Sequence, residues 1–184
     1  AISAIARLDG ATADTRLAQV LDVEQILKSV MPVTTEEINR EVVGPELILP
    51  AGSVILAVDD SAVARSVIEL GLKAMGVPYV MTRTGKEAWE RLQSLSDEAV
   101  AQGKSATDKV AVVLTDLEMP EMDGFTLTRN IKQSARLSGL PVVIHSSLSG
   151  SANEDHVRSV GADGYVAKFV AEDLANTLCK VLLP

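Results

Sequence analysis

Residues 112–124 read VVLTDLEMPEMDG. In this stretch an apolar run ends on Asp116, and Pro120 and Gly124 then mark a turn before a helical pattern begins. A short apolar run without alternation is typical of a strand that is buried on both faces, as in a parallel sheet. The stretch therefore predicts a central β-strand that ends on an acid.

The same pattern recurs on both sides of this stretch. Apolar runs at residues 53–58, 78–82, 111–115, 141–145 and 164–168 predict strands. Helical patterns follow them, first up to Gly76 and then at about 85–102, 124–136, 151–160 and 172–183. Strands that alternate with helices indicate an α/β domain, in which helices cover both faces of a parallel sheet.

Chemically active side chains follow these predicted strands. Asp59 and Asp60 follow the first strand, Asp116 the third and Ser146 the fourth, and Lys168 ends the fifth. Ligands of such sheets bind outside the carboxyl ends of the strands, so these groups should converge there. Crowded carboxylates favour a hard cation such as Mg2+, and an ammonium and a hydroxyl can stabilise a transferring phosphoryl group.

Composition narrows the possible partners. The net charge is −8 and basic residues do not cluster, which argues against nucleic acid and anionic membranes as main partners. No apolar run is long enough to span a bilayer, so we expect a soluble protein without membrane insertion. The single cysteine, Cys179, excludes an intramolecular disulfide and fits a cytoplasmic location.

Four motifs in order resemble one family. VDDS (58–61), TDLEMPEMDG (115–124), PVVIHSS (141–147) and GADGYVAK (161–168) look like the receiver domain of two-component response regulators. The resemblance covers residues 52–184. It implies a flavodoxin-like, doubly wound, five-stranded parallel sheet with the strand order 2-1-3-4-5.

The resemblance also implies a phosphoryl acceptor and a metal site. Asp116 would accept a phosphoryl group from a histidine kinase in the presence of Mg2+. Asp59, Asp60 and Asp116 would bind the ion, Asp59 mainly through a bound water, together with the backbone carbonyl of Glu118. Glu121 and Asp123 are interpreted as turn residues that favour the following helix.

Other residues would respond to the phosphoryl group. By the same resemblance, Ser146 would be the switch hydroxyl, Lys168 would pair with a phosphoryl oxygen and Tyr165 would change rotamer on activation. Receivers usually have a proline after the lysine, whereas this chain has Phe169. A cis bond before a non-proline residue is costly, so we expect a trans bond between Lys168 and Phe169.

The first fifty residues resemble a second family. AISAIARLDG (1–10) and RLAQVLDVEQILKSVMP (16–32) are similar to the last hairpin and helix of CheW-like coupling domains. We expect a remnant of such a domain at 1–31, a linker at 32–51 and the receiver at 52–184. This layout, with HSSLSG and the Lys-Phe dipeptide, resembles chemotaxis proteins of the CheV type.

The predicted function is that of a regulatory receiver, not of an enzyme acting on external substrates. Its partners would be a histidine kinase and, through the coupling domain, a chemoreceptor and kinase array. Alternatives are a phosphatase with an aspartyl-phosphate intermediate and an adapter or flavin-binding module that takes no phosphate. A role as a phosphate sink also remains open. His145, His156 and Cys179 are interpreted as structural or surface residues.

Overall fold

The computed structural model describes residues 2–7, 17–21, 47–147, 157, 159–168 and 171–182. The chain divides into two compact units, residues 1–39 and residues 40–184. In the first unit, β1 (Ile2–Arg7) and β2 (Leu17–Leu21) pair as an antiparallel sheet, as the sequence pattern predicts. The helix that the CheW-like resemblance implies before residue 32 and most of the predicted linker lie outside the described residues, and the predicted domain boundaries stay predictions.

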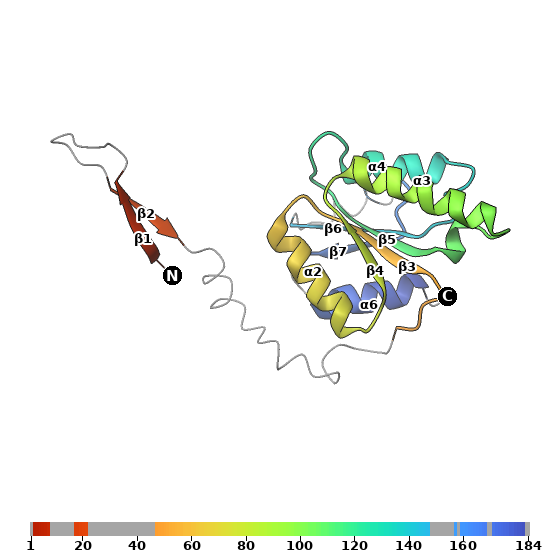
Figure 1. Cartoon of the computed structure of the whole chain (residues 1–184), viewed down its shortest axis with the longest axis horizontal. Coiled ribbons are helices and arrows are strands. Elements are labelled where there is room, and N and C mark those ends of the chain that lie inside the picture. Colours follow the sequence, from red (N-terminus) through yellow and green to blue (C-terminus); the bar gives the residue numbers. More distant parts are fainter. Residues whose placement is uncertain are drawn as a thin grey trace. The chain divides into compact units, whose positions relative to one another are not determined.

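The second unit is built on a parallel sheet. Its strands are β3 (Val54–Val58), β4 (Tyr79–Thr82), β5 (Val110–Asp116), β6 (Val142–Ser146) and β7 (Gly164–Ala167). They lie side by side in the order β4-β3-β5-β6-β7 (Figure 1). Numbered within this sheet, the order is 2-1-3-4-5, so the predicted flavodoxin-like fold is confirmed.

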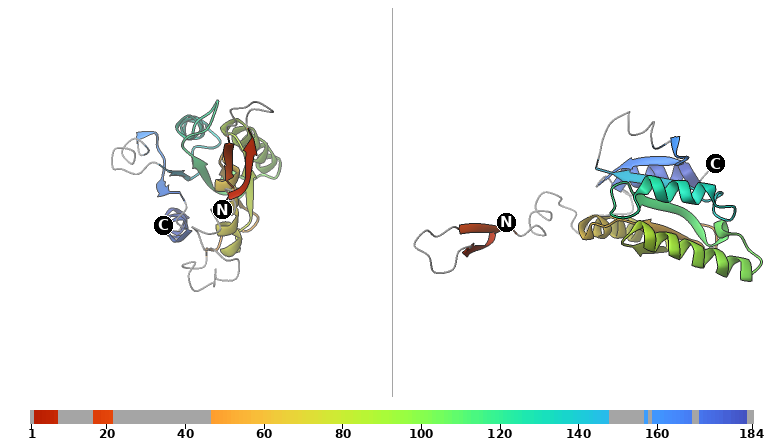
Figure 2. Two further views of the ribbon diagram at one scale, coloured as in Figure 1. Left: turned by 90° about the vertical axis from the view of Figure 1, so that its left-hand side faces the viewer. Right: turned by 90° about the horizontal axis from the view of Figure 1, so that it is seen from above.

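Helices cover both faces of this sheet. α2 (Ala62–Ala74) and α6 (Ala171–Leu182) lie side by side on one face, and α3 (Gly85–Ala101) and α4 (Gly124–Gln133) lie on the other (Figures 1 and 2). α4 ends three residues before its predicted end, because Ser134 leaves the helical conformation with ψ 125°. Most of the helix predicted at 151–160 lies outside the described residues.

The core consists of one apolar layer on each face of the sheet. Leu56 and Val58 of β3 pack towards α3 and α4, whereas Ile55 and Ala57 of the same strand pack towards α2 and α6. Successive side chains of a strand point to opposite faces, so each face of β3 needs its own apolar set. This explains why the strands read as unbroken apolar runs.

Residues 102–109, here called the insertion, join α3 to the amino end of β5 and so lie away from the carboxyl ends of the strands. The insertion contains a single 3-10 turn, η1 (Ala106–Asp108), whose Ala106 is buried in the core beneath α3. Asp108 accepts hydrogen bonds from the backbone amide and the hydroxyl of Ser105, at 2.8 and 2.7 Å. These bonds hold the pKa of Asp108 below its usual range. The insertion is therefore anchored locally and leads directly into β5.

The strand register aligns the carboxyl ends of the sheet. Val58 pairs with Thr82 on one side and with Thr115 on the other. Asp116 then pairs with His145, and Ser146 with Ala167. Residues that follow these strands therefore lie along one edge, as the sequence analysis expects.

The turn between β5 and α4 is tightly packed. Asp123 caps α4 by accepting a hydrogen bond from the amide of Thr126 at 2.6 Å, which agrees with its interpretation as a turn residue. Glu121 adopts a positive φ of 65°. A Cβ atom on Gly124 would lie 2.2 Å from the carbonyl oxygen of Asp116. Only glycine therefore lets the start of α4 rest on the backbone of Asp116.

We predict that Gly124→Ala lowers the free energy of unfolding by about 2–3 kcal/mol, because backbone must move to admit the methyl group. Chemical denaturation measures this loss. Gly71→Ala in the middle of α2 is the matched control, since its Cβ would meet only Leu174 at 3.8 Å. The control should keep its stability or gain up to about 1 kcal/mol, and equal losses in both variants would contradict the packing argument.

Candidate functional site

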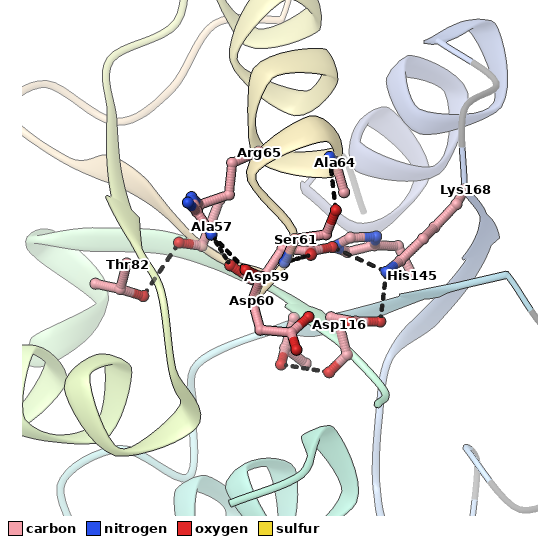
Figure 3. A network of polar contacts seen from close by, with 11 residues as sticks. Ala57, Asp59, Asp60, Ser61, Ala64, Arg65, Thr82, Asp116, His145 and Lys168 are labelled. Atoms are coloured by element: carbon pink, nitrogen blue, oxygen red, sulfur yellow. Dashed lines mark hydrogen bonds and ion pairs between the residues drawn. The ribbon is translucent and has the colours of Figure 1, made fainter. Parts of the chain in front are cut away.

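Three charged side chains meet at the carboxyl edge of the sheet. Lys168 Nζ lies 3.0 Å from Asp59 Oδ2 and 2.9 Å from Asp116 Oδ1 (Figure 3). Asp59 follows β3, Asp116 ends β5 and Lys168 follows β7. The structure thus brings together three of the predicted site residues, from strands that are distant in sequence.

The site is largely closed to water. Asp59 is fully buried and Asp116 is 2 % exposed, so their charges need a partner inside the protein. Lys168 supplies it. Burial alone would lower the pKa of Lys168, but its contacts with Asp116 and then Asp59 outweigh burial and raise this pKa above its ordinary value. The ammonium therefore stays charged and links the two carboxylates.

The loop after β3 is fixed by three further hydrogen bonds. The amide of Ser61 donates to Asp59 Oδ1 at 2.8 Å, while Ser61 also caps α2. Arg65, at the end of the first turn of α2, donates from Nη1 to the carbonyls of Asp59 and Asp60, at 2.9 and 2.8 Å. Arg65 thus holds the backbone that carries both acids, a role that the sequence analysis did not assign. The sequence feature that could have indicated this role is a basic residue six positions after Asp59, early in the following helix.

His145 is the other residue whose place the sequence analysis missed. It is 3 % exposed, and its Nε2 lies 3.5 Å from Asp59 Oδ2. Burial, followed by the positive charge of Lys168, lowers the pKa of His145 to about 4, against the opposing effects of Asp116 and a backbone hydrogen bond to Val58. The histidine is therefore buried in a neutral form beside the acids. The sequence feature that could have indicated this position is a titratable residue in an otherwise apolar strand.

The donor set fits a magnesium ion. Carboxylate oxygens of Asp59 and Asp116 lie within 4.8 Å of each other and of a His145 nitrogen, and Asp59 Oδ2 has no hydrogen bond of good geometry among the described residues. Hard cations prefer such oxygens. Asp60, which the sequence analysis also assigns to the metal, is exposed and does not belong to this group of three.

The remaining predicted residues lie nearby along the chain. Ser146 is buried at the end of β6, and its carbonyl accepts a hydrogen bond from the amide of Lys168 at 2.9 Å. Tyr165 in β7 pairs with Ile144 and packs against the cluster of Leu117, Ile144 and Val157. Glu118 is exposed, two residues after Asp116. Phe169 lies outside the described residues, so the predicted trans bond before it stays a prediction.

The sequence of this chain matches a known protein family. Residues 55–179, which contain the whole site, match the model of the response regulator receiver domain. The chain belongs to the response regulator receiver family. Receiver domains are regulatory domains that bind Mg2+ in an acidic pocket, and the aspartates described above supply such a pocket.

Relatives extend the similarity beyond the receiver domain. Chemotaxis protein CheV1 of Helicobacter pylori is 31% identical over 169 residues, 92% of this chain and 50% of CheV1. CheV2 of the same organism is 30% identical over 181 residues, 98% of this chain and 53% of CheV2. The chain thus spans about half the length of these curated relatives. Their match to most of the chain supports a receiver of the CheV type.

A solved structure shows the same fold. The receiver domain of the histidine kinase CKI1 from Arabidopsis thaliana, complexed with Mg2+ and BeF3-, is 30% identical with a TM-score of 0.62. The match covers 72% of this chain and 91% of that one. Separately, within the part of the chain that the structure describes, no helix is long and apolar enough to cross a membrane.

The buried neutral histidine predicts a pH-dependent stability. In the unfolded chain His145 takes up a proton near its ordinary pKa, whereas in the folded chain it does so only near its pKa of about 4. The unfolded state therefore binds more protons within this window, and the free energy of unfolding falls as the pH falls. We expect His145 to account for a loss of about 2 kcal/mol between pH 7 and pH 5.

Denaturation at both pH values, with a chelator present, measures this loss. His145→Gln should lose less stability on acidification than the wild type. His156→Gln replaces the other histidine of the chain and should behave as the wild type does. An identical pH dependence in the wild type and His145→Gln would contradict the assignment.

Proposed function

We propose that Asp116 accepts a phosphoryl group from a partner histidine kinase in a reaction that requires Mg2+. The chain would catalyse only its own phosphorylation and dephosphorylation, so it would act as a regulatory domain. The observation that carries this proposal is the Lys168 ammonium, which lies between Asp59 and Asp116 at 3.0 and 2.9 Å. It joins a buried carboxylate nucleophile to a fixed positive charge at the expected sheet edge.

The chemistry follows from these groups. A carboxylate oxygen of Asp116 attacks phosphorus, the bond from phosphorus to the kinase histidine nitrogen breaks, and the electron pair stays on that nitrogen. Negative charge on the transferred oxygens is then balanced in part by Lys168. Because Asp116 is almost fully buried, little water surrounds this charge and the ammonium acts strongly on it.

Asp59, Asp60 and Asp116 would hold the magnesium ion, with the backbone carbonyl of Glu118. The ion would supply further positive charge to the phosphoryl oxygens. Support comes from the CKI1 receiver domain, whose structure contains Mg2+ and BeF3-. Arg65 would assist metal binding, because its hydrogen bonds fix the backbone of Asp59 and Asp60. The carboxylate of Asp60 would then need little backbone movement to reach the ion.

Ser146 and Tyr165 would change conformation when Asp116 is phosphorylated. Ser146 is buried at the end of β6, next to the strand that carries Asp116, and its hydroxyl would bond to the phosphoryl group. Tyr165 packs against a small apolar cluster that includes Leu117, the residue directly after the acceptor. A shift at Asp116 would therefore reach the tyrosine through a short path of packed side chains.

The phosphatase alternative finds less support. Phosphatases on related folds carry a second acid two positions after the first strand-end aspartate. Here that position holds Ser61, whose side chain accepts a hydrogen bond from Ala64 at 3.4 Å and caps α2. Ser61 therefore serves as the N-cap of α2, and the position lacks the carboxylate that such a phosphatase needs.

The proposal extends to the cellular role through the CheV relatives. Their names describe chemotaxis proteins, and the similarity reaches residues before the receiver domain. We infer that phosphorylation modulates the coupling of chemoreceptors to their kinase, and that the chain works in the cytoplasm. Neither a nucleic acid nor a membrane is required for this role.

We predict that Asp116→Asn abolishes binding of beryllofluoride, a phosphoryl analogue, because the carboxylate oxygen that bonds to beryllium is lost. Binding to the wild type should require Mg2+. Calorimetric titration with beryllofluoride measures both effects.

Glu121→Gln is the matched control for this experiment. It removes one negative charge from the same loop, but Glu121 is exposed and is not part of the carboxylate group. Its beryllofluoride affinity should stay within about threefold of the wild type, a difference of less than about 0.7 kcal/mol. Magnesium-dependent binding to Asp116→Asn that equals the wild type would sink the proposal.

A switch also requires different partner affinities in its two states. We predict that the beryllofluoride-bound chain differs at least about fivefold from the free chain in affinity for the receptor and kinase assembly, a typical coupling of 1 kcal/mol or more. Pull-down with reconstituted assemblies tests this. Equal affinities, with beryllofluoride binding intact, would instead favour the phosphate sink.

A further inference from the structure

Two buried atoms face each other at the edge of the acidic site. They are Asp59 Oδ2 and His145 Nε2, which lie 3.5 Å apart. Both side chains are more than nine-tenths buried. Lys168 Nζ pairs with Asp59 Oδ2 at 3.0 Å, whereas His145 Nε2 has no hydrogen-bond partner among the described residues. Buried polar atoms are normally satisfied, so His145 Nε2 indicates a missing partner.

The missing partner of His145 Nε2 is a hydrogen-bond donor or a metal ion, because both accept a share of a nitrogen lone pair. The imidazole of His145 also makes a hydrogen bond to the Val58 backbone. In a neutral imidazole one nitrogen donates and the other accepts. If the nitrogen facing Val58 carries the proton, Nε2 presents a lone pair to a carboxylate oxygen, and two acceptors then face each other. A cation between them would satisfy both.

The spacing agrees with a shared metal ion. Metal–nitrogen and metal–oxygen bonds of about 2.1 Å around a tetrahedral zinc ion place two ligand atoms about 3.4 Å apart. The observed 3.5 Å is close to this value. Asp116 completes a group of three whose ligand atoms lie within 4.8 Å of one another. Imidazole favours ions such as Zn2+, Ni2+ and Co2+, whereas an all-oxygen set favours Mg2+.

We propose that Asp59, Asp116 and His145 form a nitrogen-containing site for a divalent transition-metal ion, overlapping the magnesium site. This inference deepens the proposed function, because it concerns which cation the same acidic pocket takes. It does not require phosphoryl transfer to occur. His145 here is a metal ligand, where the sequence analysis interpreted it as structural.

Lys168 competes with such an ion. Its Nζ contacts the same Asp59 Oδ2 and also Asp116 Oδ1, so it neutralises the two carboxylates that a metal would bind. An ion held by His145 must displace the ammonium from Asp59, because like charges repel at this distance. Removal of the Lys168 charge should therefore strengthen metal binding.

The test uses Co2+ absorption spectra and Ni2+ titration calorimetry on the full chain. All proteins carry His156→Gln, so that His145 is the sole imidazole. We expect Co2+ to show a nitrogen ligand in this background, and His145→Gln to weaken Ni2+ binding at least about tenfold. The Mg2+ affinity of His145→Gln should fall by a smaller factor than its Ni2+ affinity, because Mg2+ prefers oxygen ligands. Lys168→Met should bind Ni2+ more tightly.

Controls separate the possible outcomes. Cys179→Ala should leave Ni2+ affinity unchanged, because this residue of α6 is buried in the core layer between the sheet and the helices α2 and α6. A spectrum with oxygen ligands alone, or equal Ni2+ affinity with and without His145, would overturn the inference. The spectrum decides even if His145→Gln does not fold. Failure of beryllofluoride binding with an intact nitrogen signature would reject the proposed function and keep the metal site.

Discussion

The charge balance at the carboxyl edge of the sheet is the constraint on which the rest of this structure depends. Two carboxylates, Asp59 and Asp116, are almost wholly removed from water, and an uncompensated charge in such a place costs several kcal/mol. The Lys168 ammonium offsets this cost by contacting both. The arrangement requires three strand ends to stop at the same level, which the parallel register provides.

Around this ion pair, the backbone is held in place from several sides. Ser61 and Arg65 bond to the loop after β3, from the helix that follows it. On the other side, Gly124 brings the start of α4 against the carbonyl of Asp116. The acids are thus fixed by secondary structure that begins immediately after each strand. The ion pairs of Lys168, the starts of α2 and α4 and the ends of β3 and β5 are in direct contact. A substitution that moves one of them therefore shifts the others.

Much of this arrangement could be predicted from the sequence, because buried parallel strands and helix starts have local signatures. The five strands of the receiver and the positions of Asp59, Asp116 and Lys168 at their ends followed from apolar runs. The early end of α4 did not, since nothing in the apolar pattern marks Ser134. The contacts of Arg65 and His145 were also missed. They depend on how side chains meet across elements, and periodicity does not report this.

The alignment of strand ends also has a consequence for how the chain folds. β3 pairs with β5 across more than fifty residues, and Lys168 arrives only with β7, the last strand among the residues that the structure describes. Contacts between residues so distant in sequence form slowly, because long loops must close first. Until β7 docks, Asp59 and Asp116 repel each other without their ammonium. Repulsion between Asp59 and Asp116 therefore disfavours the pairing of β3 with β5 until Lys168 is in place. A chain that lacks β7 has no complete site.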